Sequence, residues 1–297
     1  MVFPVAEVAV EVVVAGKKFA IISILVLGFY LLLFYIVRFD FELNPQIFSI
    51  GTLRVRWYGL LIATAVYLSY IISRKRFDNS SEKANYDTIF LLIVFLGILG
   101  ARLGFVIQNT AYFSRNLLEF FYLWQGGLSI HGAIIGGLIA IWIASAGKKI
   151  SFLKIANTIT PELLLGVAIG RFGNFINGEI IGQPTSGLLK MYVSPTNRPE
   201  KFLDSAFFHP VFLYESALLV CAYLLFLYFQ KYLKNLAIFY ALIAYNLVRF
   251  CVEFFRIDYN PIIWFFDLAQ IVSFAIIILT FFTYIIIARK NGKSRTI

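Results

Sequence analysis

The sequence predicts an all-α membrane protein, a polytopic bundle of about eight transmembrane helices with a small external cap. Of its 297 residues, 60% are hydrophobic and only 14% are charged, whereas soluble domains are nearer half apolar and a quarter charged. Several apolar runs approach the length of about 20 residues that crosses the hydrocarbon of a bilayer. The short alternating segments that are typical of a membrane β-barrel are absent from the sequence.

Eight segments are the predicted spans. In chain order they cover residues 19–37, 57–73, 88–107, 128–147, 155–176, 210–229, 236–255 and 263–288. Clusters of basic residues then fall on one side of the membrane, which the positive-inside rule identifies as the cytoplasm. These clusters are Lys17 with Lys18, Arg74 with Lys75 and Arg76, Lys148 with Lys149 and Lys154, Lys231 with Lys234, and Arg289 with Lys290, Lys293 and Arg295. Both termini are therefore expected to be cytoplasmic, and the net charge of +10 does not require a nucleic acid partner.

The spans divide the chain into two predicted parts. Residues 1–43 form an N-terminal extension with one helix, and residues 44–297 form the main membrane domain. Lys17 and Lys18 precede the first run as in a signal peptide, but the run is long and no small-residue cleavage site follows it, so we expect an uncleaved span. The stretch 180–209 contains three prolines and is predicted to be the external cap.

The densest polar stretch of the sequence lies at the end of the fifth predicted span. It contains Arg171, Asn174, Asn177 and Glu179. Such groups are costly in hydrocarbon, so they usually face a bundle interior or a wet cavity. Arg171 and Asn174 are three residues apart and share a helical face, and Gly178 allows the backbone to leave the helix. The alternative interpretation is an ordinary polar helix end at the membrane surface.

The seventh predicted span carries a second polar face. Tyr245, Arg249, Glu253 and Arg256 are spaced by four, four and three residues, which aligns them along one side of a helix. An ion pair between Arg249 and Glu253 that only locks helices together is one interpretation, and an anion site is the other. Arginine suits a phosphate because its planar guanidinium donates two parallel hydrogen bonds and stays charged.

Three more residues are candidates for a site. His131 stands in a glycine-rich stretch at a span entrance, where a side chain that titrates near neutrality suits a proton carrier, and a structural helix-end histidine is equally consistent. Tyr58 is also consistent with an aromatic belt at the membrane surface. The third candidate is Arg102. Together with Arg171 and Arg249 it gives the membrane part of the chain more positive charge than the nearby glutamates are expected to neutralise. This excess favours an anionic ligand such as a phospholipid.

The sequence predicts no cofactor and no metal. Cys221 and Cys251 lie in apolar runs, and the two histidines stand in no zinc-binding spacing. The sequence has no Walker loop, no GxSxG motif and no dinucleotide-binding glycine motif.

These features together resemble one family, prolipoprotein diacylglyceryl transferase. Residues 170–179 resemble the family signature Gly-Arg-x-Gly-Asn-Phe-x-Asn-x-Glu. Five other blocks occur in the order of the family, at residues 57–59, 100–102, 126–132, 209–215 and 249–256. The likeness runs from about residue 44 to the C-terminus, and six ordered blocks make it specific.

The resemblance implies transfer of the diacylglyceryl group of phosphatidylglycerol to the lipobox cysteine thiol of signal-peptide-bearing prolipoproteins, forming a thioether and releasing glycerol phosphate. It implies a multi-pass enzyme in the lipid bilayer of the bacterial inner membrane, with its site toward the outer leaflet. The implied catalytic residues are His131, which would activate the thiol as a base, Arg171, Arg249 and Glu179. The residues implied to bind phosphatidylglycerol are Arg171, Asn174, Tyr58, Asn177, Tyr245, Arg102, Arg249, Glu253 and Arg256.

The sequence departs from this family at two places. The family core has seven spans, so the helix predicted at 19–37 is an addition. Where many members carry an aspartate ahead of a proline, this chain has Asn157, with Pro161 following. Two other functions stay open at this point. One is a transporter or channel for an anionic solute, although the sequence has no paired halves, and the other is a phospholipid-binding membrane protein without catalysis.

Overall fold

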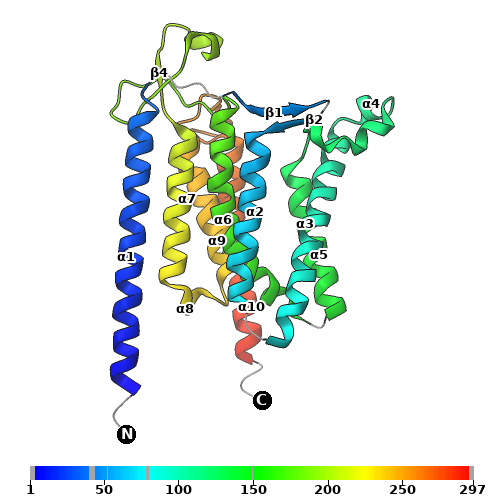
Figure 1. Cartoon of the computed structure of the whole chain (residues 1–297), viewed down its shortest axis with the longest axis vertical. Helices are drawn as coiled ribbons and strands as arrows, with labels where there is room; N and C mark the ends of the chain where they lie inside the picture. Colours follow the sequence, from blue (N-terminus) through cyan, green and yellow to red (C-terminus); the bar gives the residue numbers. More distant parts are fainter. Residues whose placement is uncertain (1–3, 40–43, 52, 78–79, 149, 294–297) are drawn as a thin grey trace. The chain divides into compact units, whose positions relative to one another are not determined.

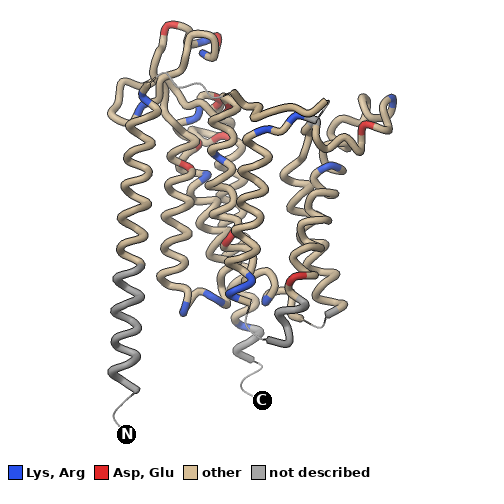
Figure 2. The backbone as a smooth tube through the Cα atoms, viewed as in Figure 1, with Lys and Arg blue, Asp and Glu red and all other residues tan. Residues whose placement is uncertain are grey.

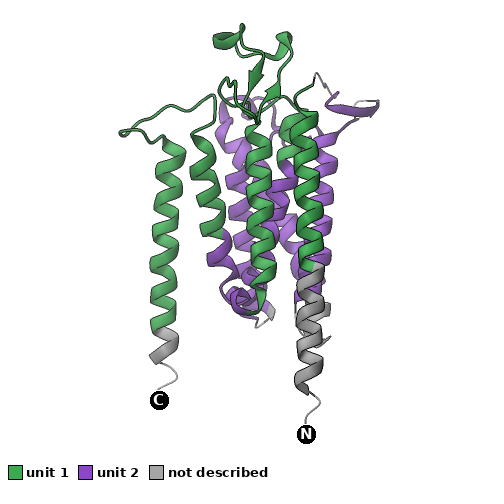
Figure 3. Ribbon diagram, turned by 90° about the vertical axis from the view of Figure 1, so that its left-hand side faces the viewer, with its two compact units in different colours: residues 1–43, 171–231, 242–297 green, residues 44–170, 232–241 purple. Residues whose placement is uncertain are grey.

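The computed structural model describes residues 4–39, 44–51, 53–77, 80–148 and 150–293, and the chain forms two compact units. Unit 1 contains residues 1–43, 171–231 and 242–297, and unit 2 contains residues 44–170 and 232–241 (Figure 3). Seven residues of the predicted cytoplasmic clusters have side chains outside the described part of the structure. They are Lys17, Lys18, Lys148, Lys149, Lys290, Lys293 and Arg295.

Unit 1 consists of long helices and a cap. Its helices are α1 (Pro4–Ile36), the last turns of α6 (Phe152–Ile176), α7 (Val211–Tyr228), most of α9 (Ala237–Glu253) and α10 (Leu268–Lys293) (Figure 1). The short helix α8 (Gln230–Leu233) follows α7. The cap contains strands β3 (Met191–Tyr192) and β4 (Phe207–Phe208), which pair antiparallel, and the 3-10 helices η3 (Pro195–Asn197) and η4 (Glu200–Phe202).

Unit 2 begins with a hairpin and continues as helices. Strands β1 (Gln46–Ile50) and β2 (Leu53–Arg56) pair antiparallel, and α2 (Trp57–Arg76) follows directly. The other long helices are α3 (Ser80–Gln108), α5 (Ile130–Lys148) and the first part of α6. Between α3 and α5 lie α4 (Thr110–Phe113), η1 (Leu117–Phe121) and η2 (Leu123–Gln125).

The predicted helical membrane bundle is confirmed. All eight predicted spans fall on helices, and within the described residues six helices are long and apolar enough to cross a membrane, namely α1, α3, α5, α6, α7 and α10. Two of the eight predicted spans, on α2 and α9, are not among these six helices. Helix α9 has only 17 residues, and α2 ends in three basic residues. The two small hairpins are the elements that the sequence did not predict, since strands of two to five residues leave no clear periodicity.

Helices α3 and α5 pack closely because their glycines face each other. Gly100 and Gly104 are four residues apart on α3, and Gly132 and Gly136 are four residues apart on α5. A Cβ atom added at Gly132 would collide with the backbone of Gly100. Small residues four apart are a common means by which transmembrane helices approach each other. This packing fixes the start of α5, where His131 lies.

A buried ion pair lies inside unit 2. The side chain of Glu162 on α6 is 0% exposed and lies 2.5 Å from a guanidinium nitrogen of Arg76 on α2. Arg76 also donates a hydrogen bond to the backbone carbonyl of Thr158 at 3.2 Å. The pair therefore joins α2 to α6 within the core.

Asn157, the departure from the family pattern, has a clear structural role in unit 2. Its Nδ2 donates to the carbonyl of Asn235 and its Oδ1 accepts from the N–H of Ile238, both at 2.9 Å. The side-chain amide of Asn157 has both N–H donors and an acceptor oxygen, so it can bond these two backbone groups at the same time. Asn157 therefore ties α6 to the start of α9.

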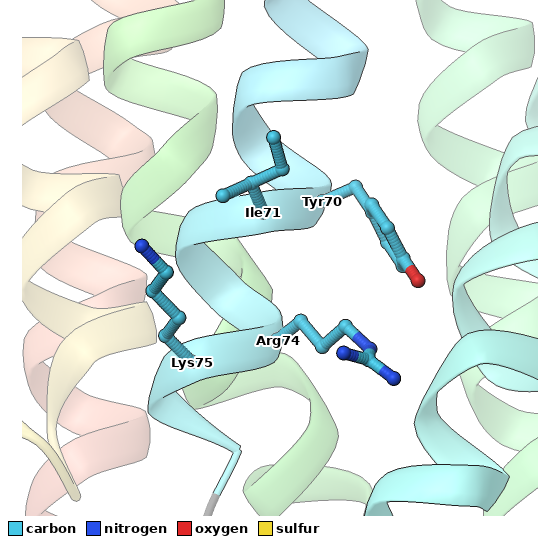
Figure 4. Close-up of a pocket in the computed structure, with 4 residues that line it drawn as sticks. All are labelled: Tyr70, Ile71, Arg74 and Lys75. Carbon is cyan, nitrogen blue, oxygen red and sulfur yellow. The ribbon is translucent and has the colours of Figure 1, made fainter.

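Both ends of α2 are basic (Figure 2). Arg54 and Arg56 lie in strand β2, directly before the first turn of α2. Arg74, Lys75 and Arg76 occupy the last turn of α2. A shallow hollow of about 190 Å³ lies at the last turn, lined by Tyr70, Ile71, Arg74 and Lys75 (Figure 4). Tyr70 and Arg74 project from the same side of the helix (Figure 4) and both bond Asp87, the arginine at 2.7 Å. This hollow is a surface groove of unit 2 that none of the predicted site residues lines.

Candidate active site

Helix α6 ends in a Schellman turn that shapes the polar stretch. The N–H of Gly178 donates to the carbonyl of Phe175 at 3.0 Å, and the N–H of Glu179 donates to the carbonyl of Asn174 at 2.8 Å. Gly178 has a φ of +71°, the left-handed conformation that a Cβ atom disfavours. The chain therefore turns back at Gly178 and brings Glu179 beside the last turn of the helix.

Arg171 and Glu215 form a buried ion pair in unit 1. The side chain of Glu215, on α7, is 0% exposed and that of Arg171 is 16% exposed. Another nitrogen of the same guanidinium lies 3.4 Å from Oδ1 of Asn174. Nε of Arg171 and Oε2 of Glu215 are buried and make no hydrogen bond with the described residues. One donor of this part-buried arginine therefore lacks a partner among the described residues.

A line of polar side chains connects this ion pair to the surface. Nδ2 of Asn174 donates to one carboxylate oxygen of Glu179 at 2.7 Å, and Nδ2 of Asn177 donates to the other at 3.2 Å. Glu179 is exposed, so the line ends in contact with the surroundings of the protein. We call Arg171, Glu215, Asn174, Asn177 and Glu179 the Arg171 network.

A second network lies at the end of α9 in unit 1. Glu253 pairs with Arg249 at 2.7 Å and with Arg256 at 3.2 Å, as the spacing in the sequence predicts. Arg256 also donates to both carboxylate oxygens of Asp258, at 2.9 and 2.7 Å, and these hydrogen bonds lower the pKa of Asp258. We call Arg249, Glu253, Arg256 and Asp258 the Arg249 network.

His209 is held in place from several directions in unit 1. Its backbone N–H donates to the carbonyl of Gln183 at 3.0 Å, and its carbonyl accepts from Gly182 at 3.1 Å. Its Nδ1 lies 2.9 Å from the hydroxyl of Tyr214, which donates its own hydrogen to the carbonyl of Leu189 at 2.8 Å. Nδ1 is therefore the donor and Nε2 the acceptor, and burial lowers the pKa of His209, which favours this neutral ring.

In unit 2, Arg102 is 3% exposed and its guanidinium is surrounded by backbone carbonyls. It donates to the carbonyls of Phe120 at 2.8 Å, Gly126 at 2.7 Å and Gly127 at 3.0 Å, and to that of Glu119. Arg102 therefore holds the loop that leads to α5. Its predicted contact with a phospholipid stays a prediction.

Two of the three arginines that we expected to exceed the nearby carboxylates have a carboxylate partner, and Arg102 has none among the described residues. Arg171 pairs with Glu215, and Arg249 pairs with Glu253. Arg102 has carbonyl dipoles instead of a carboxylate. Protein groups thus already stabilise these charges, and an anionic ligand would have to add to them.

The remaining predicted residues lie at helix ends or on a helix face. In unit 2, Tyr58 is the second residue of α2 and is 38% exposed, and His131 is the second residue of α5 and is exposed. In unit 1, Tyr245 is half-buried on α9, one turn before Arg249. Their roles in binding or catalysis stay predictions.

Sequence reasoning did not single out Glu215 as the partner of Arg171, or Asp258 as the partner of Arg256. Asp258 stands two residues after Arg256, and this short spacing is a usable signal. Glu215 lies 44 residues from Arg171, so its pairing has no local signal in the sequence.

Comparison with known proteins gives a consistent result. The model of the family described as prolipoprotein diacylglyceryl transferase matches residues 45–286. A relative from Thermotoga petrophila, named phosphatidylglycerol–prolipoprotein diacylglyceryl transferase, is 39% identical over 259 residues, which cover 85% of this chain and 87% of the relative. Relatives of the same name occur in Acaryochloris marina, with 40% identity over 72% of this chain and 80% of theirs, and in Fervidobacterium nodosum, with 36% identity over 94% and 98%.

Proposed function

Because the chain belongs to the prolipoprotein diacylglyceryl transferase family and is a membrane transferase of lipoprotein maturation, we propose that phosphatidylglycerol reacts at the Arg171 and Arg249 networks. The observation that carries this proposal is the part-buried Arg171, which connects through Asn174 to the exposed Glu179 and whose Nε makes no hydrogen bond with the described residues. A phosphate oxygen is the acceptor that such a donor favours.

The proposed reaction is a substitution at the glyceryl carbon that bears the phosphate. The sulfur of the lipobox cysteine of a prolipoprotein forms the new C–S bond, and the C–O bond to the phosphate breaks. The electron pair of that bond leaves with glycerol phosphate, and the thiol proton passes to a base. The charge that develops on the leaving phosphate is where an arginine stabilises the transition state most.

We assign the roles within unit 1 by burial. Arg171 and Arg249 stabilise the leaving phosphate, and Glu253 orients Arg249 through their 2.7 Å contact. Glu179 holds the amides of Asn174 and Asn177. Asn174 directs its carbonyl oxygen to Arg171, and Asn177 accepts a hydrogen bond from a glycerol hydroxyl of the head group. Tyr245 and Arg256 contribute hydrogen bonds to the ester or phosphate oxygens.

In unit 2 we assign the base to His131 and a lipid-bonding hydroxyl to Tyr58. A free thiol is mostly protonated near neutrality, so the reaction requires a base or a strong positive field. Arg102 contributes to lipid binding through the loop that it holds.

We also propose the placement in the cell. The multi-pass protein lies in the inner membrane of a bacterium, with both termini in the cytoplasm and the two arginine networks toward the outer leaflet. The basic last turn of α2 supports this orientation.

Mass measurement tests the function directly. Purified protein in detergent with phosphatidylglycerol and a lipobox peptide should add one diacylglyceryl unit to the peptide. The gain should vanish for a peptide with Cys→Ser and for the Arg171→Ala protein. Unchanged peptide with wild-type protein, with phosphatidylglycerol still bound, would leave lipid binding without catalysis as the function.

The role of His131 has a separate test. His131→Asn should lower turnover by about 100-fold or more near neutrality, the usual contribution of a general base, and the loss should shrink as rising pH ionises the thiol. Near-normal turnover from pH 6 to 9 would show that the positive field alone activates the thiol.

A further inference from the structure

Helix α1 lies outside the family match, which begins at residue 45, yet it is built into unit 1 (Figure 3). Only 6% of its apolar stretch Phe19–Ile36 is buried. The side chains that pack on the rest of unit 1 form a narrow stripe spaced by four, three and four residues. In it Tyr30 and Val37, the residue after the helix, are buried, and Val26 and Leu33 are partly buried. Such a stripe is one face of a helix that contacts a partner.

The stripe packs against both the cap and the start of α7. Tyr30 and Val37 share a hydrophobic cluster with Met191 and Phe208 of the cap strands and with Phe212 of α7. The aromatic residues at the end of α6 that flank the Arg171 network pack on the same cluster. The cluster therefore supports the backbone that carries the candidate site.

One polar contact fixes this packing. The hydroxyl of Tyr30 lies 2.7 Å from Oγ of Ser216 on α7. Tyr30 is 7% exposed and Ser216 is 0% exposed, so the hydrogen bond is shielded from competing water. Ser216 directly follows Glu215, the carboxylate that pairs with Arg171.

The end of α1 is also joined to the cap. The carbonyl of Val37 accepts from the N–H of Tyr192 at 2.9 Å, and Arg38 donates to the carbonyl of Leu188. The next carbonyl, that of Leu189, accepts from Tyr214 of α7. Helix α1, the cap and the first turn of α7 are thus connected by backbone groups as well as side chains.

We infer that α1 is part of the support of the site and that Tyr30 is a positioning residue for the Arg171–Glu215 pair. Successive helical residues point about 100° apart. Ser216 therefore faces Tyr30 while Glu215 faces Arg171, and any rotation of α7 that relaxes one contact moves the other. The inference rests on the proposed function of the Arg171 network.

The test compares two substitutions on helix α1, each of which removes one tyrosine hydroxyl. Tyr30→Phe removes the bond to Ser216, whereas Tyr35→Phe removes a hydroxyl from a residue that is 59% exposed and packs on Phe39. Turnover with the lipobox peptide and hydrogen exchange of the amides at residues 173–179 are measured for both. The exchange measurement needs no turnover.

Tyr30→Phe should lower kcat by about 3- to 10-fold with little change in KM, which matches the usual worth of one interhelical hydrogen bond. It should also speed exchange at residues 173–179, and Tyr35→Phe should match the wild type in both. Ser216→Ala should give a similar loss, and the double variant should be no worse than the larger single loss.

Equal kcat and equal exchange in Tyr30→Phe and Tyr35→Phe would overturn the inference. If the wild type lipidated no peptide, the proposed function would fail, and the exchange at residues 173–179 would still decide whether Tyr30 positions the network.

Discussion

Each unit contains a buried arginine–glutamate pair, and the two pairs are nearly alike in themselves. In unit 1 the side chain of Glu215 is 0% exposed and that of Arg171 is 16% exposed. In unit 2 the side chain of Glu162 is 0% exposed and that of Arg76 is 10% exposed. Burial and charge alone therefore do not distinguish a reacting pair from a structural one.

The two pairs differ in what they are connected to. Arg171 continues through Asn174 to the exposed carboxylate of Glu179. Arg76 continues to the backbone carbonyl of Thr158, inside the core of unit 2. A buried charge that leads to the surface has a route to a ligand, whereas one that ends on the protein's own backbone holds helices together.

The largest expected effect comes from breaking the structural pair. Glu162→Ala leaves the charge of Arg76 buried without its carboxylate, which should destabilise the fold by about 3–5 kcal/mol. Thermal unfolding in detergent measures this loss, and activity per folded molecule should be unchanged. Replacing both partners with apolar residues of similar size should recover most of the stability. If activity fell by more than the loss of folded protein explains, the Arg76–Glu162 pair would have a functional role.

Matched lysine substitutions sharpen the comparison. Arg171→Lys keeps the charge but loses the planar fork, so kcat/KM should fall by about 100-fold or more. Arg76→Lys makes the same change in unit 2 and should lower only the unfolding midpoint. The peptide mass assay and a thermal scan of each variant decide the matter, and comparable activities of the two variants would contradict the difference drawn between the pairs.

The turn that links the Arg171 pair to the surface gives a smaller effect. Gly178→Ala places a Cβ atom at a φ of +71°, where an L-residue costs about 1–2 kcal/mol. A Cβ atom at Gly178 meets nothing within 4 Å, so the cost is backbone strain and not a collision. Turnover should fall several-fold because Glu179 is displaced from Asn174.

Gly147→Ala on α5 is the matched control for this turn. Its Cβ atom also meets nothing within 4 Å, but the backbone there is helical. The substitution should stabilise the protein by up to about 1 kcal/mol and leave turnover unchanged. Equal behaviour of the two alanine variants in unfolding and turnover would mean that the turn at Gly178 does not position Glu179.

The smallest expected effect concerns pH and the Arg249 network. The hydrogen bonds from Arg256 lower the pKa of Asp258 below that of the unfolded chain. The stabilisation is therefore complete above about pH 4, the unfolded pKa of an aspartate, and is lost as pH falls through the lower folded pKa. Asp258 is 60% exposed, so the effect should be below about 1 kcal/mol.

Asp258→Asn checks this pH dependence. The unfolding midpoint of the wild type should fall more steeply than that of the variant between about pH 4 and pH 2. If the unfolding midpoints of the wild type and the variant fell equally steeply at acid pH, the pair of Asp258 with Arg256 would contribute nothing measurable to stability.

By itself the sequence determined whatever depends on neighbouring residues along the chain. Apolar runs of membrane length determined the helical spans, and a spacing of four placed Arg249 beside Glu253 on α9. The glycine at 178 after a polar helix end indicated where α6 stops. These features follow from helix geometry and backbone sterics, which act over a few residues.

Only the tertiary structure decided which distant residues meet. The choice of Glu215 as the partner of Arg171 and the contact of Tyr30 with Ser216 join residues 44 and 186 positions apart. Such contacts depend on how helices pack, and a one-residue rotation of a helix redirects every side chain by about 100°. For the same reason the sequence could suggest that arginines gather in the membrane, but not which of them leads to the surface.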